Sequence, residues 1–226
     1  MNAMTDCELQ NIDPDDISDV LVKVEKSFDI KFRGTELMHI STFGELCDHI
    51  TNKIQLDHSS DCTNQQAFYK LREAIASTAQ IDSKTITVNN VLTDIFPKHS
   101  RRLTVKKLER HLGFKLDILR PPFWLTLILA IFYVASLAGI YFNWPIGLTG
   151  LMFSHTSLWI AHKTGKVLDL QTVGQLAKKM TTENYLKSRR NPTTCNKIEI
   201  EKVLTDLFSS ELYLDKSKLT REAKLA

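Results

Sequence analysis

A run of residues without Asp, Glu, Lys or Arg, from Phe123 to Ala161, constrains the fold of this chain more than any other feature. Such a run is typical of a segment that leaves water, because a charged side chain is costly to place in hydrocarbon. A bilayer core of about 30 Å takes roughly 20 helical residues to cross. Trp124–Phe142 meets that length, and the Asn-Trp-Pro sequence at 143–145 ends the helix. Ile146–Ala161 is a second, shorter apolar segment, so we expect a two-helix transmembrane hairpin over residues 123–161.

Basic residues on both sides of the apolar run favour this interpretation over its alternative, a buried helical hairpin in a soluble protein. Residues 98–120 hold eight Lys or Arg against two acidic residues, a net charge of +6. His162, Lys163 and Lys166 follow the run, and the turn between the two segments carries no charge. Because basic flanks stay on the cytoplasmic side of a membrane, both chain termini are expected in the cytoplasm.

The remaining sequence is polar, poor in glycine and patterned for helices, which predicts two small soluble parts. Residues 1–54 hold eleven acidic and five basic residues, a net charge of −6. No zinc-type cluster is formed by the four cysteines, Cys7, Cys47, Cys62 and Cys195, and free thiols are expected. The sequence has no phosphate-binding loop, serine-hydrolase motif or zinc-protease motif, so we predict neither a metal nor an enzymatic activity.

Residues 12–54 have the pattern of short amphipathic helices. Asp13 suits the N-cap position and Pro14 the first helical position, and apolar residues follow at helical spacing up to Phe28. A short helix at Glu36–His39 and a helix capped by Ser41 or Thr42 are expected next.

These residues resemble the second half of an acyl carrier protein. The stretch DVLVKVEKSFDIKF is similar to the family's second helix and the phrase that ends it, and ISTFGELCDHI is similar to the fourth helix. The resemblance implies carrier helices II to IV over residues 12–54. Together with the hairpin, it implies a bacterial membrane-bound carrier-like protein in the inner membrane.

Three later segments resemble further parts of the same bundle. Residues 65–120 are similar to helices I and II of a second unit and residues 167–181 to its last helix, so the hairpin would be inserted within that unit. After a polar linker at Thr181–Lys197, residues 198–226 resemble helix I and are expected to complete the first unit, within the chain or in a homodimer. The expected fold class is all-α, with small helical bundles resembling acyl carrier protein plus a two-helix transmembrane hairpin.

Both carrier-like units differ from the family at one position. In the family a serine at the head of helix II carries phosphopantetheine, the arm that holds the acyl group. The matching positions here are Pro14 and Lys98, and neither residue has a hydroxyl. The resemblance therefore implies no cofactor, while Ser18 and Ser100 remain alternative attachment sites.

Two groups of residues are candidate sites. Lipid headgroups or an acidic partner are the expected ligands of one group, Arg101, Arg102, Lys106, Lys107 and Arg110. Few aromatic residues accompany them, so nucleic acid is not an expected partner. The other group is an intramembrane polar cluster, Ser154, His155, Thr156 and Ser157, which is either functional or hydrogen-bonded across the hairpin.

The sequence favours a non-catalytic, membrane-tethered interaction module that recruits or regulates enzymes of lipid or polyketide synthesis. Its expected partners are membrane lipids, acyl-processing enzymes and a second copy of the chain. Two alternatives stay open: a membrane acyl-transfer or lipid-handling enzyme that uses His155, and a true acyl carrier modified at Ser18 or Ser100.

Overall fold

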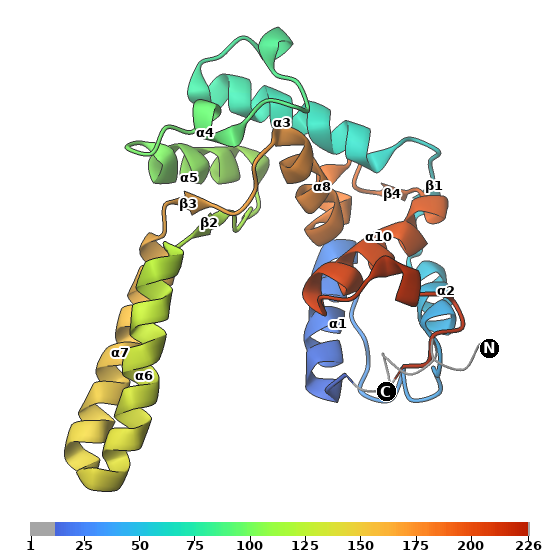
Figure 1. Cartoon of the computed structure of the whole chain (residues 1–226). Helices are drawn as coiled ribbons and strands as arrows, with labels where there is room; N and C mark the ends of the chain where they lie inside the picture. Colours follow the sequence, from blue (N-terminus) through green and yellow to red (C-terminus); the bar gives the residue numbers. More distant parts are fainter. Residues whose placement is uncertain (1–11, 226) are drawn as a thin grey trace. The chain divides into compact units, whose positions relative to one another are not determined.

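The computed structural model describes residues 12–225, so Cys7 lies outside the described residues. Most of the described residues are helical, which confirms the expectation of an all-α chain (Figure 1). The helices are α1 (Pro14–Phe28), α2 (Phe43–Lys53), α3 (Thr63–Ala79), α4 (Leu92–Ile95), α5 (Arg101–Leu112), α6 (Phe123–Phe142), α7 (Trp144–Thr164), α8 (Val173–Glu183), α9 (Tyr185–Ser188) and α10 (Lys197–Glu211). Four two-residue strands accompany them: β1 (Asp57–His58), β2 (Leu119–Arg120), β3 (Val167–Leu168) and β4 (Thr194–Cys195).

The described residues form two compact units. The first unit comprises the chain up to Glu73 together with the chain from Gly174 onward, and the second unit spans Ala74–Val173. The chain thus leaves the first unit, builds the second, and returns to finish the first. The boundaries of the carrier-like repeats stay a prediction, because compactness does not test the resemblance.

The starts of α1 and α2 follow the capping signals in the sequence. The Asp13 carboxylate accepts a hydrogen bond from the Asp15 N–H at 3.0 Å, and Pro14 occupies the first position of α1. At α2 the Thr42 hydroxyl accepts from the Glu45 N–H while the Glu45 carboxylate accepts from the Thr42 N–H, forming a capping box. Both helices therefore begin where their first N–H groups find side-chain acceptors.

The segment between α1 and α2 differs from the prediction. Residues 34–39 form turns, and the predicted short helix at Glu36–His39 is absent. The Glu36 carboxylate accepts from the Arg33 N–H at 2.9 Å, which closes a turn at this point. The same carboxylate contacts His49 and pairs with Lys53, both of α2, so Glu36 holds the turn against that helix.

The core of the first unit joins α10 to α1 and α2. Phe43 and Phe208 meet edge to face with ring centroids 5.2 Å apart. The helices contribute these buried side chains: Val20, Val24 and Phe28 from α1; Phe43, Leu46, Cys47 and Ile50 from α2; and Ile200, Val203, Leu204, Leu207 and Phe208 from α10. Each large apolar side chain contributes about 1.5–3 kcal/mol before ordering costs. The apolar stripes of α1 and α10 therefore pack against each other.

The last described residues pack over the start of α2. Thr42 and Lys224 form an isolated antiparallel bridge, and the Phe43 N–H donates to the Ala223 carbonyl at 2.8 Å. A Cβ on Gly44 would lie 2.7 Å from the Arg221 carbonyl oxygen, so only glycine permits this approach. The C-terminal segment is thus an integral part of the first unit.

The segment Thr181–Lys197, which the sequence predicts as a polar linker, is built into the first unit instead. Its Tyr185 and Arg189 side chains are 0% and 1% exposed. The buried Ser27 hydroxyl of α1 donates to the Thr182 carbonyl at 2.8 Å and accepts from the Tyr185 N–H at 3.0 Å. The linker prediction is wrong because the polar groups of this segment find buried partners.

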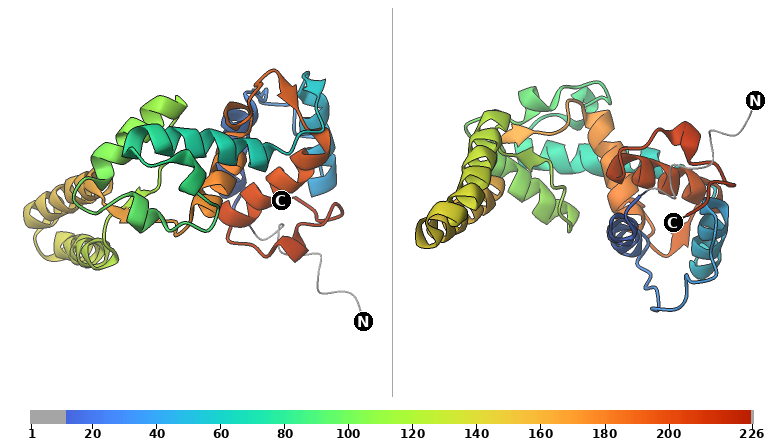
Figure 2. Two further views of the ribbon diagram at one scale, coloured as in Figure 1. Left: turned by 90° about the horizontal axis from the view of Figure 1, so that it is seen from above. Right: turned by 60° about the horizontal axis from the view of Figure 1, so that its bottom comes forward.

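The second unit carries α6 and α7 on a short antiparallel ladder. In this ladder Leu119 of β2 lies opposite Leu168 of β3, and Arg120 lies opposite Val167. Because α6 follows β2 and α7 precedes β3, the chain enters and leaves the helical hairpin side by side (Figures 1 and 2). A Cβ on Gly165 would lie 2.4 Å from the Arg120 carbonyl carbon, so glycine is needed where the chain leaves α7.

Small residues line the contact between α6 and α7, which lie side by side in Figures 1 and 2. A Cβ on Gly147 would lie 2.4 Å from the backbone nitrogen of Ile140. One on Gly150 would lie 2.5 Å from the Ser136 hydroxyl oxygen. Close approach at small residues is typical of helix pairs in membranes, where no hydrophobic effect drives association.

Candidate membrane interface

Large apolar side chains are exposed along both helices of the hairpin. Phe132 is 60% exposed, Phe153 71% and Tyr141 90%. A helix with apolar residues all around requires an apolar environment. Among the described helices, only α6 is both long and apolar enough to cross a membrane. α7 has 21 residues, but its Ser, Thr and His residues lower its hydropathy.

Tryptophans mark both ends of the hairpin. Trp124 and Trp159 lie toward the β2–β3 end, and Trp144 lies at the turn; each is at least 60% exposed. The ammonium group of Lys163 sits 4.3 Å from the centre of the Trp159 ring. Tryptophan is enriched at both membrane–water interfaces, and lysine extends its charge toward the headgroups. The hairpin thus has exposed tryptophans at both of its ends.

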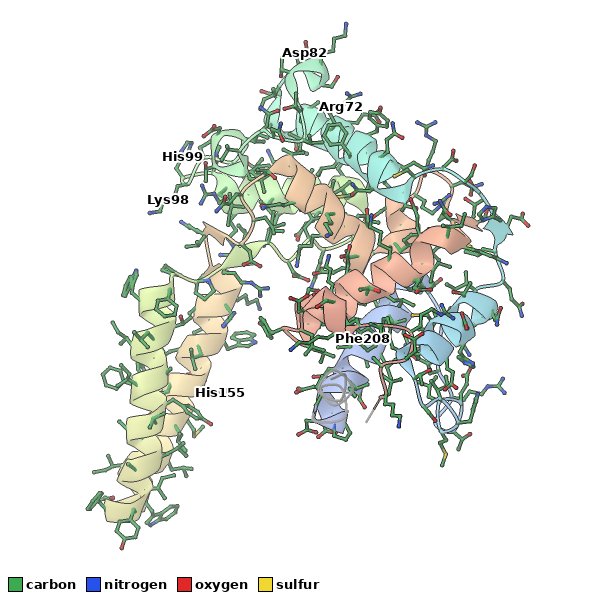
Figure 3. All side chains as sticks on the ribbon, turned by 45° about the vertical axis from the view of Figure 1, so that its right-hand side comes forward. Arg72, Asp82, Lys98, His99, His155 and Phe208 are labelled. Carbon is green, nitrogen blue, oxygen red and sulfur yellow. The ribbon has the colours of Figure 1, made fainter. Side chains whose placement is uncertain are left out.

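The four consecutive polar residues of α7 do not form one site. The Ser154 side chain is buried in the contact with α6, and its hydroxyl donates to the Gly150 carbonyl at 2.9 Å. The Thr156 hydroxyl donates to the Met152 carbonyl at 2.8 Å. His155 is exposed on the hairpin surface (Figure 3) and makes no hydrogen bond within residues 12–225. The hydroxyl bonds of Ser154 and Thr156 therefore stay within α7, and among the described residues no side chain hydrogen-bonds to His155.

Of the five basic candidates on α5, one is structural. The Arg101 guanidinium is 8% exposed and donates to the carbonyls of Phe96 and Lys166, each at 2.8 Å. It links the turn before α5 to the segment before β3, and its burial leaves little of the guanidinium open to a headgroup. The other four side chains are half-buried or exposed: Arg102, Lys106, Lys107 and Arg110.

The carrier-like attachment positions are both at the protein surface. Pro14 is the exposed first residue of α1, and the Ser18 hydroxyl one turn later donates to the Pro14 carbonyl at 2.9 Å. Lys98 is exposed before α5 (Figure 3), and Ser100 is the half-buried residue that precedes this helix. Ser18 is thus held by its own helix.

The cysteines of the described chain are free thiols in different surroundings. Burial raises the pKa of Cys47 to about 12, and burial also raises the pKa of Cys195. Cys62 is exposed. Because the thiolate is the reactive and metal-binding form, Cys47 and Cys195 are poor nucleophiles and ligands. Among residues 12–225 no group of three or more His, Cys, Asp or Glu residues could hold a metal ion.

One buried charge was not apparent from the sequence. Arg189 donates to the Thr63 hydroxyl at the start of α3, to the Asp61 carbonyl at 3.4 Å and to the Thr194 hydroxyl at 3.4 Å. These contacts tie the segment after α9 to the start of α3. In the sequence, the nearby aromatic residue Tyr185 is the one indication that Arg189 could be buried. In the structure its ring lies against the guanidinium, with 5.8 Å between the ring centre and Arg189 Cζ.

Comparison with protein families, with curated proteins and with solved structures finds no match to this chain.

Proposed function

We propose that this protein is a membrane-tethered, non-catalytic interaction module whose soluble helices derive from an acyl carrier bundle without its phosphopantetheine arm. The observation that carries the proposal is the exposed apolar surface of the α6–α7 hairpin. Exposed apolar area of this extent on a water-soluble monomer would lead to association. A bilayer covers it without any partner protein.

Both helices of the hairpin cross the bilayer in this proposal. α6 has 20 residues and α7 has 21, so each is about 30 Å long at 1.5 Å per residue. The lower hydropathy of α7 is offset because Ser154 faces α6 and its hydroxyl bonds to the helix backbone. With two crossings, the basic residues before α6 and after α7 lie together on the cytoplasmic side.

The soluble surface best suited to a partner is the exposed acidic face of α1. Asp16 and Asp19 border a hollow of about 350 Å³ together with Lys23 and Glu211. Val22 adds an apolar side chain that is 61% exposed. An acidic rim around an apolar contact suits a basic patch on a partner protein. Basic acyl-processing enzymes are therefore the partners we propose.

The central experiment replaces residues 123–164 by a short Gly-Ser segment that joins Pro122 to Gly165. The β2–β3 ladder already brings these ends together, so both units should remain helical. We expect the wild-type protein in the carbonate-resistant membrane fraction and the variant in the soluble fraction. Reporter fusions at the two chain ends should both report the cytoplasmic side. A wild-type chain that is soluble and monomeric would refute the tether.

A second experiment addresses the chemistry. After coexpression with a phosphopantetheinyl transferase, the intact mass should be unchanged, because neither Pro14 nor Lys98 offers a hydroxyl. An adduct that is lost in Ser18→Ala or Ser100→Ala would instead identify a true carrier. His155→Ala should leave partner capture unchanged, whereas loss of the cellular effect in this variant would favour the enzyme alternative.

A further inference from the structure

A hollow in the second unit collects cationic and hydroxyl side chains from two helices. It lies between the end of α3 and the later turns of α5 and has a volume of about 380 Å³. Its lining consists of Ser77, Thr78, Gln80, Lys107, Arg110 and His111. No carboxylate is among these residues.

The positive charge of this hollow is not neutralised within the protein. Lys107 and Arg110 are three residues apart on α5, so they share one face, where like charges destabilise a helix. Neither makes an ion pair within residues 12–225. Glu109 lies between them in the sequence, but its carboxylate accepts from the Leu116 N–H at 2.8 Å. The two cations thus face the hollow without a counter-charge.

Some polar groups of the hollow form hydrogen bonds within the protein, and others are left to bind a ligand. The hydroxyls of Ser77 and Thr78 donate to the Ala74 carbonyl at 3.0 and 2.7 Å, which fixes them on α3. The Ser77 oxygen lies 3.5 Å from Nδ1 of His111, which positions the imidazole at the edge of the hollow. The donors left for a ligand are the ammonium of Lys107, the guanidinium of Arg110 and the amide of Gln80.

We propose that this hollow binds a phosphomonoester group. A phosphomonoester carries a charge of roughly −1.5 to −2 near neutral pH, which matches two fixed cations, and it offers three terminal oxygens. The Arg110 guanidinium suits a bidentate contact to two of these oxygens, and Lys107 suits the third as a point charge. The group comes either from the headgroup of a phosphatidic-acid-type lipid or from a soluble phosphate ester. The lipid source rests on the proposed membrane tether, and the soluble source does not.

The test uses the full-length protein in detergent and the variants Lys107→Gln, Arg110→Gln, Arg110→Lys and Lys106→Gln. Lys106→Gln is the matched control, because Lys106 is exposed on the same helix and does not line the hollow. The probes are inorganic phosphate, measured by titration, and phosphatidic acid against phosphatidylglycerol, measured by native mass spectrometry. All four substitutions are at side chains that are exposed, so the variants should keep the wild-type circular dichroism spectrum.

We expect Lys107→Gln and Arg110→Gln each to weaken binding by about tenfold or more, the loss of one charge-assisted hydrogen bond. Lys106→Gln should change the affinity less than about twofold. The loss in Arg110→Lys should lie between the losses in Lys106→Gln and Arg110→Gln. A preference for phosphatidic acid that disappears in the hollow variants identifies the lipid source. Binding of inorganic phosphate without a lipid preference identifies the soluble source.

Equal losses in Lys106→Gln and Lys107→Gln would overturn the proposal, because they indicate a diffuse basic surface rather than a site. Absence of binding to every probe would overturn it as well. Membrane fractionation of the same proteins tests the membrane tether independently of phosphate binding. A soluble wild-type chain that still binds phosphate through Lys107 would refute the tether and support the hollow.

Discussion

α1 and α10 in the first unit bury their apolar side chains against each other, whereas α6 and α7 in the second unit expose theirs. Val24 and Leu204 are 0% exposed, while Phe132 and Trp159 are each 60% exposed. Apolar content alone does not explain this difference. The first pair concentrates its apolar residues on one stripe of each helix, and the second pair carries them around the whole circumference.

The residues that hold each pair together differ accordingly. Large side chains such as Phe28 and Phe208 fill the space next to α1 and α10, and water drives their burial. At the α6–α7 contact Gly147 and Gly150 let the backbones approach, which leaves the large side chains for the surroundings. The two helix pairs therefore differ in the size of the residues at their contacts.

The largest expected effect on stability comes from a charge placed in the contact between α1 and α10. Leu204→Lys puts an ammonium without a partner into the core of the first unit, which should cost more than about 4 kcal/mol of the free energy of unfolding. Ile198→Lys on the same helix is the control, since that side chain is 82% exposed. Hydrogen exchange of the α1 and α10 amides in the full-length protein reads out the loss. Equal protection in the two variants would contradict the described core.

A larger residue at the contact between α6 and α7 should have the next largest effect on stability. Gly147→Val forces α6 and α7 apart, because even a Cβ would lie 2.4 Å from the Ile140 nitrogen. Overpacking of this kind costs about 1–3 kcal/mol. Gly139→Ala serves as the control, since its Cβ would lie at an ordinary 3.7 Å from Gly147. Faster hydrogen exchange of α6 and α7 amides in micelles is expected for Gly147→Val alone.

The sequence predicts local features better than distant contacts. The cap at Asp13, a cap at Ser41 or Thr42 and the break before Trp144 depend on neighbouring residues, and all three are present, the second at Thr42. The docking of α10 on the first unit is expected only from the resemblance of residues 198–226 to a carrier helix I. The burial of Arg189 could not be predicted, because its acceptors at Asp61 and Thr63 lie more than a hundred residues earlier.

The candidate sites show the same limit. Residues 154–157 are consecutive in the sequence, but successive side chains on a helix point about 100° apart. Ser154 therefore faces α6 while His155 faces outward. Arg101 resembles its basic neighbours in the sequence, and only the position of the Lys166 carbonyl makes it structural. A local pattern cannot specify which polar residues meet.

A smaller effect is expected at the start of α2. Thr42→Ala removes the hydroxyl that accepts the Glu45 N–H, which should lower the stability of the first unit by about 1 kcal/mol. Ser41→Ala, one residue earlier, leaves that acceptor in place and should change the denaturation midpoint little. A matched decrease in both variants would show that the capping box does not act as described.

The smallest expected effect depends on pH. Hydrogen bonds from Lys53 and from the Arg33 N–H lower the pKa of Glu36 from 4.5 to about 2. A carboxyl whose pKa is lowered by folding stabilises the protein above its ordinary pKa, and this contribution is lost as the pH falls toward 2. Glu36→Gln should therefore lower the denaturation midpoint slightly at neutral pH and leave it unchanged below about pH 2. A difference that grows in acid would contradict this assignment.

The ladder beneath the helical hairpin has a mechanical consequence. Both of its strands connect to the hairpin at the same end, through Arg120 and Val167. A force that pulls the hairpin away from the second unit therefore draws β2 and β3 in the same direction. The hydrogen bonds between the two strands are not sheared by such a load, and it passes instead to the contacts that each strand makes with the rest of the unit. Arg101 donates a hydrogen bond to the Lys166 carbonyl directly before β3, so it is positioned to resist this load.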